Sequence, residues 1–340
     1  MRVWRLWRER LNHEYWPWPL IYLPVFPVAL WHAVRTGRGA FFTNVNPGID
    51  LGGFFGERKS EILARLPQSA YPTTLLVQPG TPVRVVEARM REEQLTLPLI
   101  MKPDVGERGT GVMVVRNTDE LRALLSETHE PQLLQELVTW PAEFGLMFVK
   151  DPRSRRTTLL SITAKTFLSV TGDGRSTVED LLKRTWRGTK QVQRLRVYRK
   201  ELLESIPGAE EGVLVEPIGN HCRGTIFRDG RYLATPELER ALDGMLAHAE
   251  GIYYGRLDVR SPSEEALKQG LYKVMELNGV TSEPGHIYDP SFTIYHCWKE
   301  LLRHVRHIPP LSDALRSRGH QPASVRELRH RYRSYFKMAL

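Results

Sequence analysis

The sequence predicts an α+β protein, because short apolar strands and amphipathic helices are interspersed along it without a regular repeat. The runs TTLLV, QLLQELV and EFGLMFV are typical of strands, whereas TDELRALLSET and PELERALDGMLAHAEG have apolar residues at helical spacing. A chain of 340 residues with 41% apolar and 26% charged residues has the composition of a globular protein and can form one large or two medium domains.

The first segment of the chain, residues 1–38, is basic and rich in Trp and Pro. Within it, residues 15–34 contain no Asp, Glu, Lys or Arg, and this length could just cross a bilayer. Prolines interrupt the stretch at Pro17, Pro19, Pro24 and Pro27. Because proline lacks a backbone donor and tryptophan prefers the headgroup region, we expect the segment to lie in the interface of an anionic membrane. An arm packed over the domain surface and a true membrane span are the alternatives.

The positive charge of the chain, +9 in total, belongs to its two ends. Residues 1–38 hold six Arg against two Glu, and residues 299–340 hold ten Lys or Arg against three acids, so the central part is slightly negative. Basic ends favour an acidic partner such as anionic lipid, whereas a solvated helical surface is the alternative. Nucleic acid is not expected, because no groove-reading or stacked-aromatic motif accompanies the charge. The two cysteines, Cys222 and Cys297, are too few for a disulfide framework and fit a reducing cytoplasm.

The remaining elements are expected in the following order. Strands are expected at 73–77, 95–103, 112–116, 132–138, 143–149, 157–170, 212–218 and 224–234. Helices are expected at 60–68, 118–128, 190–206 and 236–251, with two or three more towards the C-terminus. Thr118 is the expected cap of its helix, the Asp-Gly pair at 229–230 predicts a hairpin turn, and Gly251 should end the helix that precedes it.

Two further strands, YYGRLDVRS (253–261) and YKVMELNGV (272–280), gather polar side chains. Because side chains alternate along a strand, Arg256, Asp258 and Arg260 share one face of the first strand, and Glu276 and Asn278 share one face of the second. Burying these groups costs free energy unless they are paired or hold a ligand. Since carboxylate and amide oxygens suit Mg²⁺, we expect Asp258, Glu276 and Asn278 to bind metal. A salt-bridged sheet face is the alternative.

A glycine-rich loop, DVGERGTG (104–111), follows a strand that ends in Lys102. Its spacing matches neither the Walker nor the Rossmann motif. Its glycine backbone, next to Lys102 and Arg108, can nevertheless approach a phosphate closely. A simple turn between two strands is the alternative. Together with the expected metal ligands, the loop predicts a nucleotide site.

The order of these motifs resembles the ATP-grasp superfamily over about residues 57–290. PLIMKPDVGERGTGV resembles the strand and glycine flap over the nucleotide phosphates, and GRLDVR…VMELNG is similar to the metal signature of D-alanine–D-alanine ligases. AKTFLSVTGDGRSTVEDLL looks more like the corresponding segment of cyanophycin synthetases. The resemblance implies an ATP-grasp fold, with two α+β subdomains clamping ATP and a reduced N-terminal domain. It also implies that Asp258, Glu276 and Asn278 hold two Mg²⁺ and that Arg256 steadies the transferred phosphoryl group.

LLQELVTWPAEFGL resembles the hinge of D-alanine–D-alanine ligases, which implies that Glu136 precedes the adenine-binding backbone and that Glu143 binds the ribose. The alternatives are a solvated strand end for Glu136 and a surface ion pair with Lys150 for Glu143. The resemblance also makes Lys165 a candidate second phosphate contact. The nucleotide-binding residues expected in all are Lys102, Arg108, Gly109, Glu136, Leu137, Val138, Glu143 and Lys165.

The expected catalytic residues are Arg256, Lys165, Arg223 and Arg260. Arg223, in GNHCRGT, could bind a substrate carboxylate, because a guanidinium forks onto carboxylates. Arg260 could do the same, and pairing with a neighbouring acid is its alternative. His221 is as well explained as a capped loop histidine.

The resemblance implies that ATP activates a carboxylate as an acyl phosphate, which an amine then attacks. D-alanine is not implied as substrate, because the N-terminal domain is reduced and the loop NGVTSEPGHIYDP is extended. We expect an ATP-dependent, Mg²⁺-dependent carboxylate–amine ligase acting on small or lipid-linked substrates, cytoplasmic and peripheral to the inner face of the cell membrane. A kinase that leaves phosphate on its product and a non-catalytic nucleotide-binding, membrane-tethered protein are the alternatives.

The expected domains are 1–38, the basic Trp/Pro-rich segment; 39–95, a reduced N-terminal region; 96–145, the nucleotide flap subdomain; 146–298, the metal and catalytic subdomain; and 299–340, the basic C-terminal helices.

Overall fold

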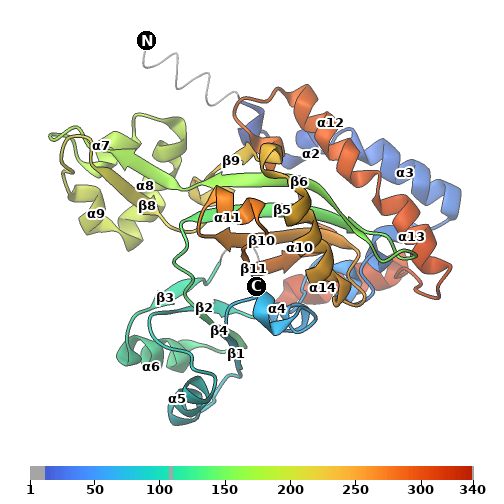
Figure 1. Ribbon diagram of the computed structural model, residues 1–340, viewed down its shortest axis with the longest axis horizontal. Helices are drawn as coiled ribbons and strands as arrows, with labels where there is room; N and C mark the ends of the chain where they lie inside the picture. The colour runs from blue at the N-terminus through green and yellow to red at the C-terminus, as the bar shows by residue number, and fades with distance from the viewer. Residues whose placement is uncertain (1–11, 107–109, 339–340) are drawn as a thin grey trace.

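The computed structural model describes residues 12–106 and 110–338, and its strands form three antiparallel sheets. The four-stranded sheet has the order β1 (Thr74–Val77), β4 (Gln132–Glu136), β2 (Leu99–Pro103), β3 (Met113–Val115). The five-stranded sheet has the order β11 (Lys273–Asn278), β10 (Tyr254–Ser261), β5 (Ala142–Lys150), β6 (Thr157–Thr166), β9 (Ile226–Asp229). The third sheet pairs β7 (Leu168–Thr171) with β8 (Gly212–Glu216). Helices accompany each sheet (Figure 1), so the predicted α+β class is confirmed.

The four-stranded sheet has an apolar core of its own. In β1 the side chains of Leu75 and Val77 are buried at alternate positions, because successive strand side chains point to opposite faces. Two helices, α5 (Val83–Glu92) and α6 (Thr118–Glu127), pack on the sheet. The residues that join strands and helices in this core are Val86, Met90, Leu99, Met101, Leu121 and Leu134. In Figure 1 this unit lies below the five-stranded sheet.

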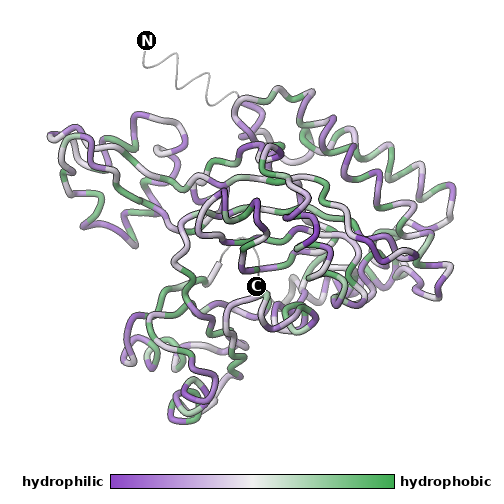
Figure 2. Tube along the Cα trace, in the orientation of Figure 1, coloured by the Kyte–Doolittle hydropathy of each residue, from purple (hydrophilic) through white to green (hydrophobic). Residues whose placement is uncertain are grey.

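The five-stranded sheet is apolar on one face and divided on the other. On the apolar face, Leu257 and Val259 of β10 pack with α10 (Pro236–Ala247), whose leucines recur at every fourth residue. On the other face, Met147 and Tyr254 join an apolar cluster with α13 (Ile308–Arg316). The rest of that face is polar and leads to the candidate site. In Figure 2 apolar segments run along the central strands, whereas hydrophilic segments gather at the outer loops.

The two ends of the chain pack against each other. The N-terminal helices α2 (Trp18–Ile21) and α3 (Val25–Thr36) lie beside α12 (Ile294–Val305) in Figure 1. Ile21 is buried there in a small apolar cluster with Ile287, Cys297 and Leu301. The last helix, α14 (Val325–Met338), follows α13. Among the described residues, no helix combines the length and hydropathy needed to cross a bilayer.

Two expected elements are divided differently in the structure. The helix expected at 190–206 is broken at Arg199, whose φ of −142° is not helical, into α8 (Trp186–Tyr198) and α9 (Lys200–Glu204). The break lets Leu203 pack in an apolar cluster with α7 (Val178–Leu182). The strand expected at 157–170 is split between β6 and β7, which belong to different sheets. Local β propensity continues through both strands and does not indicate that the chain changes sheets.

Further expectations are wrong at the ends of elements. The Asp-Gly pair at 229–230 makes no hairpin, because the next residues form a 3-10 helix, η6 (Arg231–Leu233). Asn117 and not Thr118 caps α6, since its side chain accepts a hydrogen bond from the Glu120 backbone. Helix α10 ends at Ala247, before Gly251. Helix α5 was not expected at all.

Candidate functional site

The two polar strands β10 and β11 pair antiparallel, and their register places Asp258 opposite Glu276 and Arg256 opposite Asn278. The expectation that they share one polar face is therefore confirmed. Asp258 lies at the centre of this face and is 8% exposed. Arg256 forks onto its carboxylate with contacts of 3.2 Å from Nε and 3.0 Å from Nη2. Asn278 Nδ2 donates to the same carboxylate at 3.0 Å.

A third donor to Asp258 comes from β6, on the far side of β5. Lys165 Nζ lies 2.9 Å from Asp258 Oδ1 and 2.9 Å from Glu143 Oε1. Burial by itself raises the pKa of Asp258, but Arg256 and Lys165 outweigh it and hold the pKa well below its ordinary value. Burial likewise lowers the pKa of Lys165, but Asp258 and Glu143 outweigh it and raise this pKa. Strands β10, β5 and β6 thus bring together a charge cluster that is buried, paired and ionised.

Glu143 also pairs with Arg260, whose Nε lies 3.2 Å from Glu143 Oε2. The other donors of Arg260 reach Val138 O at 2.8 Å and Pro217 O at 2.9 Å. The pair with Glu143 is the alternative weighed for this residue, pairing with a neighbouring acid. The role of Arg260 in binding a carboxylate remains a prediction. The surface pair of Glu143 with Lys150 is not formed, because Lys150 Nζ donates to Leu246 O and Ala249 O instead.

Lys102 extends from the four-stranded sheet to the edge of the five-stranded one. Its Nζ donates to Gln135 Oε1 at 2.9 Å and to Met275 O of β11 at 3.2 Å. Burial lowers the pKa of Lys102 to about 8, and the charge of Glu276 opposes this shift in part. The structure thus brings the expected phosphate contact next to an expected metal ligand, although the two residues lie on different sheets.

A lysine that sequence reasoning missed completes this side. Lys59 begins α4 (Lys59–Leu63), and its Nζ lies 4.0 Å from Glu276 Oε1 and 2.6 Å from Gly106 O of the glycine loop. The buried Asp104 positions it by accepting hydrogen bonds from the backbone and side chain of Ser60. The clue in the sequence was the basic pair at the start of a short helix after a glycine-rich stretch.

The other expected nucleotide residues are placed as follows. Glu136, at the end of β4, pairs with Lys273 of β11, with both oxygens 3.1 Å from Lys273 Nζ. Leu137 and Val138 follow it, and Val138 is buried. Arg108 and Gly109 lie outside the described residues. Their roles in nucleotide binding remain predictions.

Arg223 belongs to the 3-10 helix η5 (His221–Arg223), and its Nη1 lies 3.9 Å from Glu216 Oε2. Glu216 is also held by Arg194 at 2.7 Å. The role of Arg223 in binding a carboxylate remains a prediction.

The N-terminal segment lies against the candidate site, which the sequence did not indicate. Arg256 Nη1 donates to Glu283 O at 3.0 Å, in the extended loop after β11. The Glu283 carboxylate accepts hydrogen bonds from the hydroxyls of Tyr22 and Tyr288. Burial is the main cause that raises the pKa of both tyrosines, and Glu283 adds to it, so both stay protonated donors. The Trp/Pro-rich segment therefore supplies a side chain at the end of the site where Arg256 lies.

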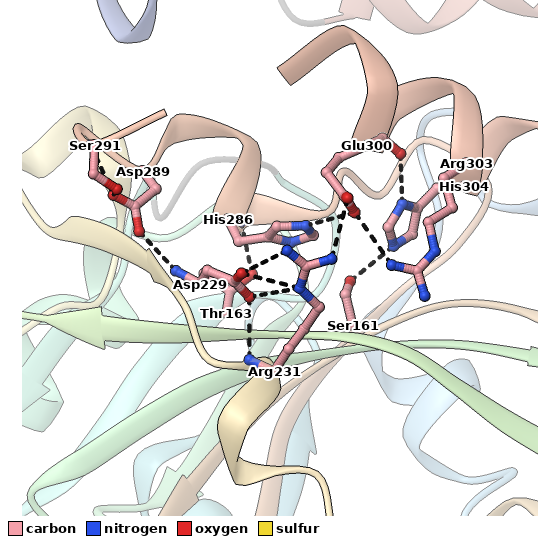
Figure 3. A network of polar contacts seen from close by, with 10 residues as sticks. All are labelled: Ser161, Thr163, Asp229, Arg231, His286, Asp289, Ser291, Glu300, Arg303 and His304. Carbon is pink, nitrogen blue, oxygen red and sulfur yellow. Dashed lines mark hydrogen bonds and ion pairs between the residues drawn. The ribbon is translucent and has the colours of Figure 1, made fainter. Parts of the chain in front are cut away.

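A buried polar network fixes the same loop to the sheet and to α12 (Figure 3). His286 lies in η7 (Gly285–Tyr288); its backbone N–H donates to Thr163 Oγ1 at 2.9 Å, and its Nε2 lies 3.1 Å from Glu300 Oε2. Burial lowers the pKa of His304 to about 4, so its neutral ring accepts from the Ser161 hydroxyl at 2.8 Å and donates to Glu300 O at 2.7 Å. Since Ser161 and Thr163 are neighbours of Lys165 on β6, the network sets the loop relative to the charge cluster.

The expected metal ligands fit Mg²⁺ by their chemistry. Asp258 and Glu276 offer carboxylate oxygens from directly opposed strand positions, and Asn278, two residues after Glu276 on β11, offers an amide oxygen. Hard oxygen donors of this kind are what Mg²⁺ requires. The Glu276 side chain is 35% exposed, with Lys59 at the outer limit of an ion pair. Within 12–106 and 110–338, no group of three or more His, Cys, Asp or Glu side chains is arranged to hold a metal ion.

Comparison with known proteins returns solved structures. No protein-family model matches the chain, and no curated protein matches it. A D-alanine–D-alanine ligase from Bacillus anthracis is 15% identical, with a TM-score of 0.42 over 74% of this chain and 68% of the ligase. A bifunctional glutathione synthetase from Pasteurella multocida is 18% identical, with a TM-score of 0.38 over 68% of this chain. This match spans only 34% of the synthetase, about a third of its length. The ATP-grasp ligase PsnB is 12% identical, with a TM-score of 0.38 over 73% of this chain and 60% of PsnB. Of these three, PsnB is an ATP-grasp ligase by its name.

Proposed function

We propose that the chain is an ATP-dependent carboxylate–amine ligase that works at a membrane surface. The observation that supports this most is the meeting of Lys102 with β11. Lys102 comes from the four-stranded sheet and donates to Met275 O, the residue before Glu276. A cation suited to phosphate and a carboxylate suited to metal therefore lie together between two sheets, which is where a nucleotide triphosphate with its metal would be held.

The cations of the five-stranded sheet suit transfer of a phosphoryl group. Lys165 and Arg256 both donate to Asp258 in the unliganded protein. An entering phosphate would compete with Asp258 for these donors, which already lie at the site and would stabilise the negative charge of the phosphate. Bound at Asp258, Glu276 and Asn278, Mg²⁺ would supply further neutralisation of the phosphate oxygens.

The proposed reaction has two steps. The γ-phosphoryl group of ATP passes to a substrate carboxylate, giving an acyl phosphate and ADP, and an amine then displaces phosphate to form the amide. Arg256 stabilises the charge on the transferring group, and Lys102 holds the phosphates of the nucleotide. The glycine loop DVGERGTG (104–111) would exclude water, which would otherwise hydrolyse the acyl phosphate. The substrates are a carboxylate and an amine, small or lipid-linked.

Product analysis by mass spectrometry tests the proposal. The full chain is incubated with ATP, Mg²⁺ and pooled amino acids, dicarboxylates, polyamines and amphiphilic amines, with Glu276→Gln as control. Substrate-dependent ADP and free phosphate, with a new mass equal to two substrates less water, supports the ligase. ADP with the phosphate retained on an organic product would show that the protein is a kinase and not a ligase. ATP binding without turnover on these pools and on membrane extracts would favour the non-catalytic nucleotide-binding protein, and turnover that survives in Glu276→Gln would end the metal assignment.

A further inference from the structure

Helix α3 exposes an apolar face. Leu30, Trp31 and Val34 are 65%, 71% and 71% exposed, and Phe26 is also exposed one turn earlier. The opposite side of the helix is the packed one, where His32 is buried against Phe41 with ring centroids 4.4 Å apart. A surface helix normally has polar residues on its outer face, so α3 has the reverse of the expected pattern.

The exposed apolar face continues over α2. Trp18 and Leu23 are 66% and 52% exposed, and the whole stretch 15–34 contains no charged residue. Exposed apolar residues are ordinary when they are scattered, but a contiguous group on one short segment is typical of an interaction surface. Two of the exposed residues are tryptophans, the side chain that favours the boundary between headgroups and acyl chains.

A row of cations runs along the neighbouring helix. Helix α12 packs on α2 and α3, and Trp298 Nε1 donates to Leu20 O at 3.1 Å. Lys299 and Arg303 on α12, and Arg306 directly after its last residue, recur at spacings of four and three residues, and all three are exposed. The one acid among these turns, Glu300, is buried and engaged by His286 and Arg231, and it also lies 3.6 Å from Arg303. The row therefore places net positive charge on the helix that neighbours α2 and α3.

We propose that this surface binds the interface of an anionic lipid bilayer. We call it the α2–α3 surface; it consists of Trp18, Leu23, Phe26, Leu30, Trp31, Val34, Lys299, Arg303 and Arg306. Apolar side chains with tryptophans would enter the headgroup boundary, and the flanking cations would contact anionic headgroups. The positive charge favours an anionic bilayer over other partners, because an apolar protein partner or a second copy of the chain would not require an adjoining row of three cations.

The helices would lie along the membrane plane. Helix α3 has 12 residues, so at 1.5 Å per residue it is about 18 Å long, well short of the hydrocarbon core of about 30 Å. The same segment faces the candidate site on its inner side, where Tyr22 donates to Glu283. Docking would therefore hold the Arg256 end of the site close to the bilayer. The proposal deepens the membrane clause of the proposed function, but it does not depend on the ligase chemistry.

Flotation of the full chain with lipid vesicles tests it. Vesicles of phosphatidylcholine alone are compared with vesicles that also contain phosphatidylglycerol. We expect binding to the anionic vesicles, weaker binding at high salt, and little binding to the neutral ones. The double variant Leu30→Glu, Trp31→Glu should bind at least about tenfold more weakly, because it removes two buried apolar contacts from the complex. The double variant Lys299→Glu, Arg306→Glu should lose at least about fivefold per cation on anionic vesicles.

The matched control introduces the same number of glutamates at two exposed apolar residues of another helix. Val197 and Tyr198 on α8 are 75% and 76% exposed, so Val197→Glu with Tyr198→Glu should leave vesicle binding unchanged. Thermal unfolding checks that each variant is folded, and light scattering reports its oligomeric state. Absence of binding to anionic vesicles would overturn the proposal, as would equal binding by the α3 variant and wild type. A dimer that the α3 variant dissociates would assign the surface to a second copy instead. Loss of vesicle binding with unchanged turnover on soluble substrates would separate this proposal from the ligase.

Discussion

Asp258→Asn should destabilise the unliganded protein, although Asp258 is an expected metal ligand. Where several carboxylates converge to bind a metal, replacing one of them usually relieves the repulsion between their negative charges. Here the carboxylate instead holds Lys165 at 2.9 Å and Arg256 at 3.0 Å, and it is almost fully buried. The isosteric amide keeps the shape but leaves Lys165 and the partly buried Arg256 without their shared counter-charge.

The magnitude follows from these contacts. Hydrogen bonds to charged groups contribute about 1.5–3 kcal/mol each, and breaking a buried ion pair costs about 3–5 kcal/mol. Lys165 retains Glu143 at 2.9 Å and Arg256 retains the Glu283 carbonyl at 3.0 Å, so the loss is partial. We expect a decrease of about 2–4 kcal/mol in the free energy of unfolding. For 340 residues this lowers Tm by about 3–6 °C.

The assay is chemical and thermal unfolding without ATP or Mg²⁺, with Glu276→Gln as the matched control. Among the described residues Glu276 has one ion pair, with Lys59 at 4.0 Å, and its side chain is 35% exposed, so its variant should lose less than about 1 kcal/mol. Both variants should abolish turnover.

The pKa of Asp258 is lowered in the folded protein, so the contribution of Asp258 to the free energy of unfolding is present above the unfolded pKa of about 4 and is lost as pH falls. Wild-type stability in Asp258→Asn, or equal losses in both variants, would refute the reasoning.

Three further predictions concern Lys102, the buried histidine network and the N-terminal contact. Lys102→Met removes a buried ammonium whose pKa burial lowers to about 8, so stability at pH 7 should be unchanged or higher, whereas calorimetry should show ATP binding weakened at least about tenfold. Unchanged ATP affinity would count against the phosphate role. Burial lowers the pKa of His304 to about 4, so its contribution of about 2–3 kcal/mol is present above the unfolded value of about 6.5 and is lost as pH falls from there towards 4. The pKa of Glu300 is lowered to about 2, chiefly by its hydrogen bond with His286, so acid unfolding curves should show a second loss below about 4.5 that Glu300→Gln removes. Tyr22→Phe should lower stability by about 1–2 kcal/mol by leaving Glu283 with one hydroxyl donor fewer, and should raise the KM of a substrate more than it changes kcat; equal stability of variant and wild type would argue against the contact.

Local patterning determined much of the candidate site. The alternation of side chains along β10 and β11 was enough to place Arg256, Asp258, Glu276 and Asn278 on one face, because a strand has a period of two whatever surrounds it. The short apolar runs likewise predicted most strands. Patterning failed where a break interrupts a stretch of continuous helix propensity, as at Arg199 between α8 and α9. Contacts between residues distant in sequence outweigh the local preference there.

Only the tertiary structure decided what these side chains contact. Lys165 lies 93 residues from Asp258 in sequence, yet the order β10–β5–β6 brings them together. Tyr22 and Lys59 reach the site from segments far ahead of it, and sequence spacing contains no information about such approaches. The sequence by itself thus identified the candidate residues for binding metal and phosphate, since candidacy depends on side-chain chemistry and strand period. The structure decided that they are buried and mutually paired, since pairing between sheets and across the N-terminal segment depends on how the whole chain packs.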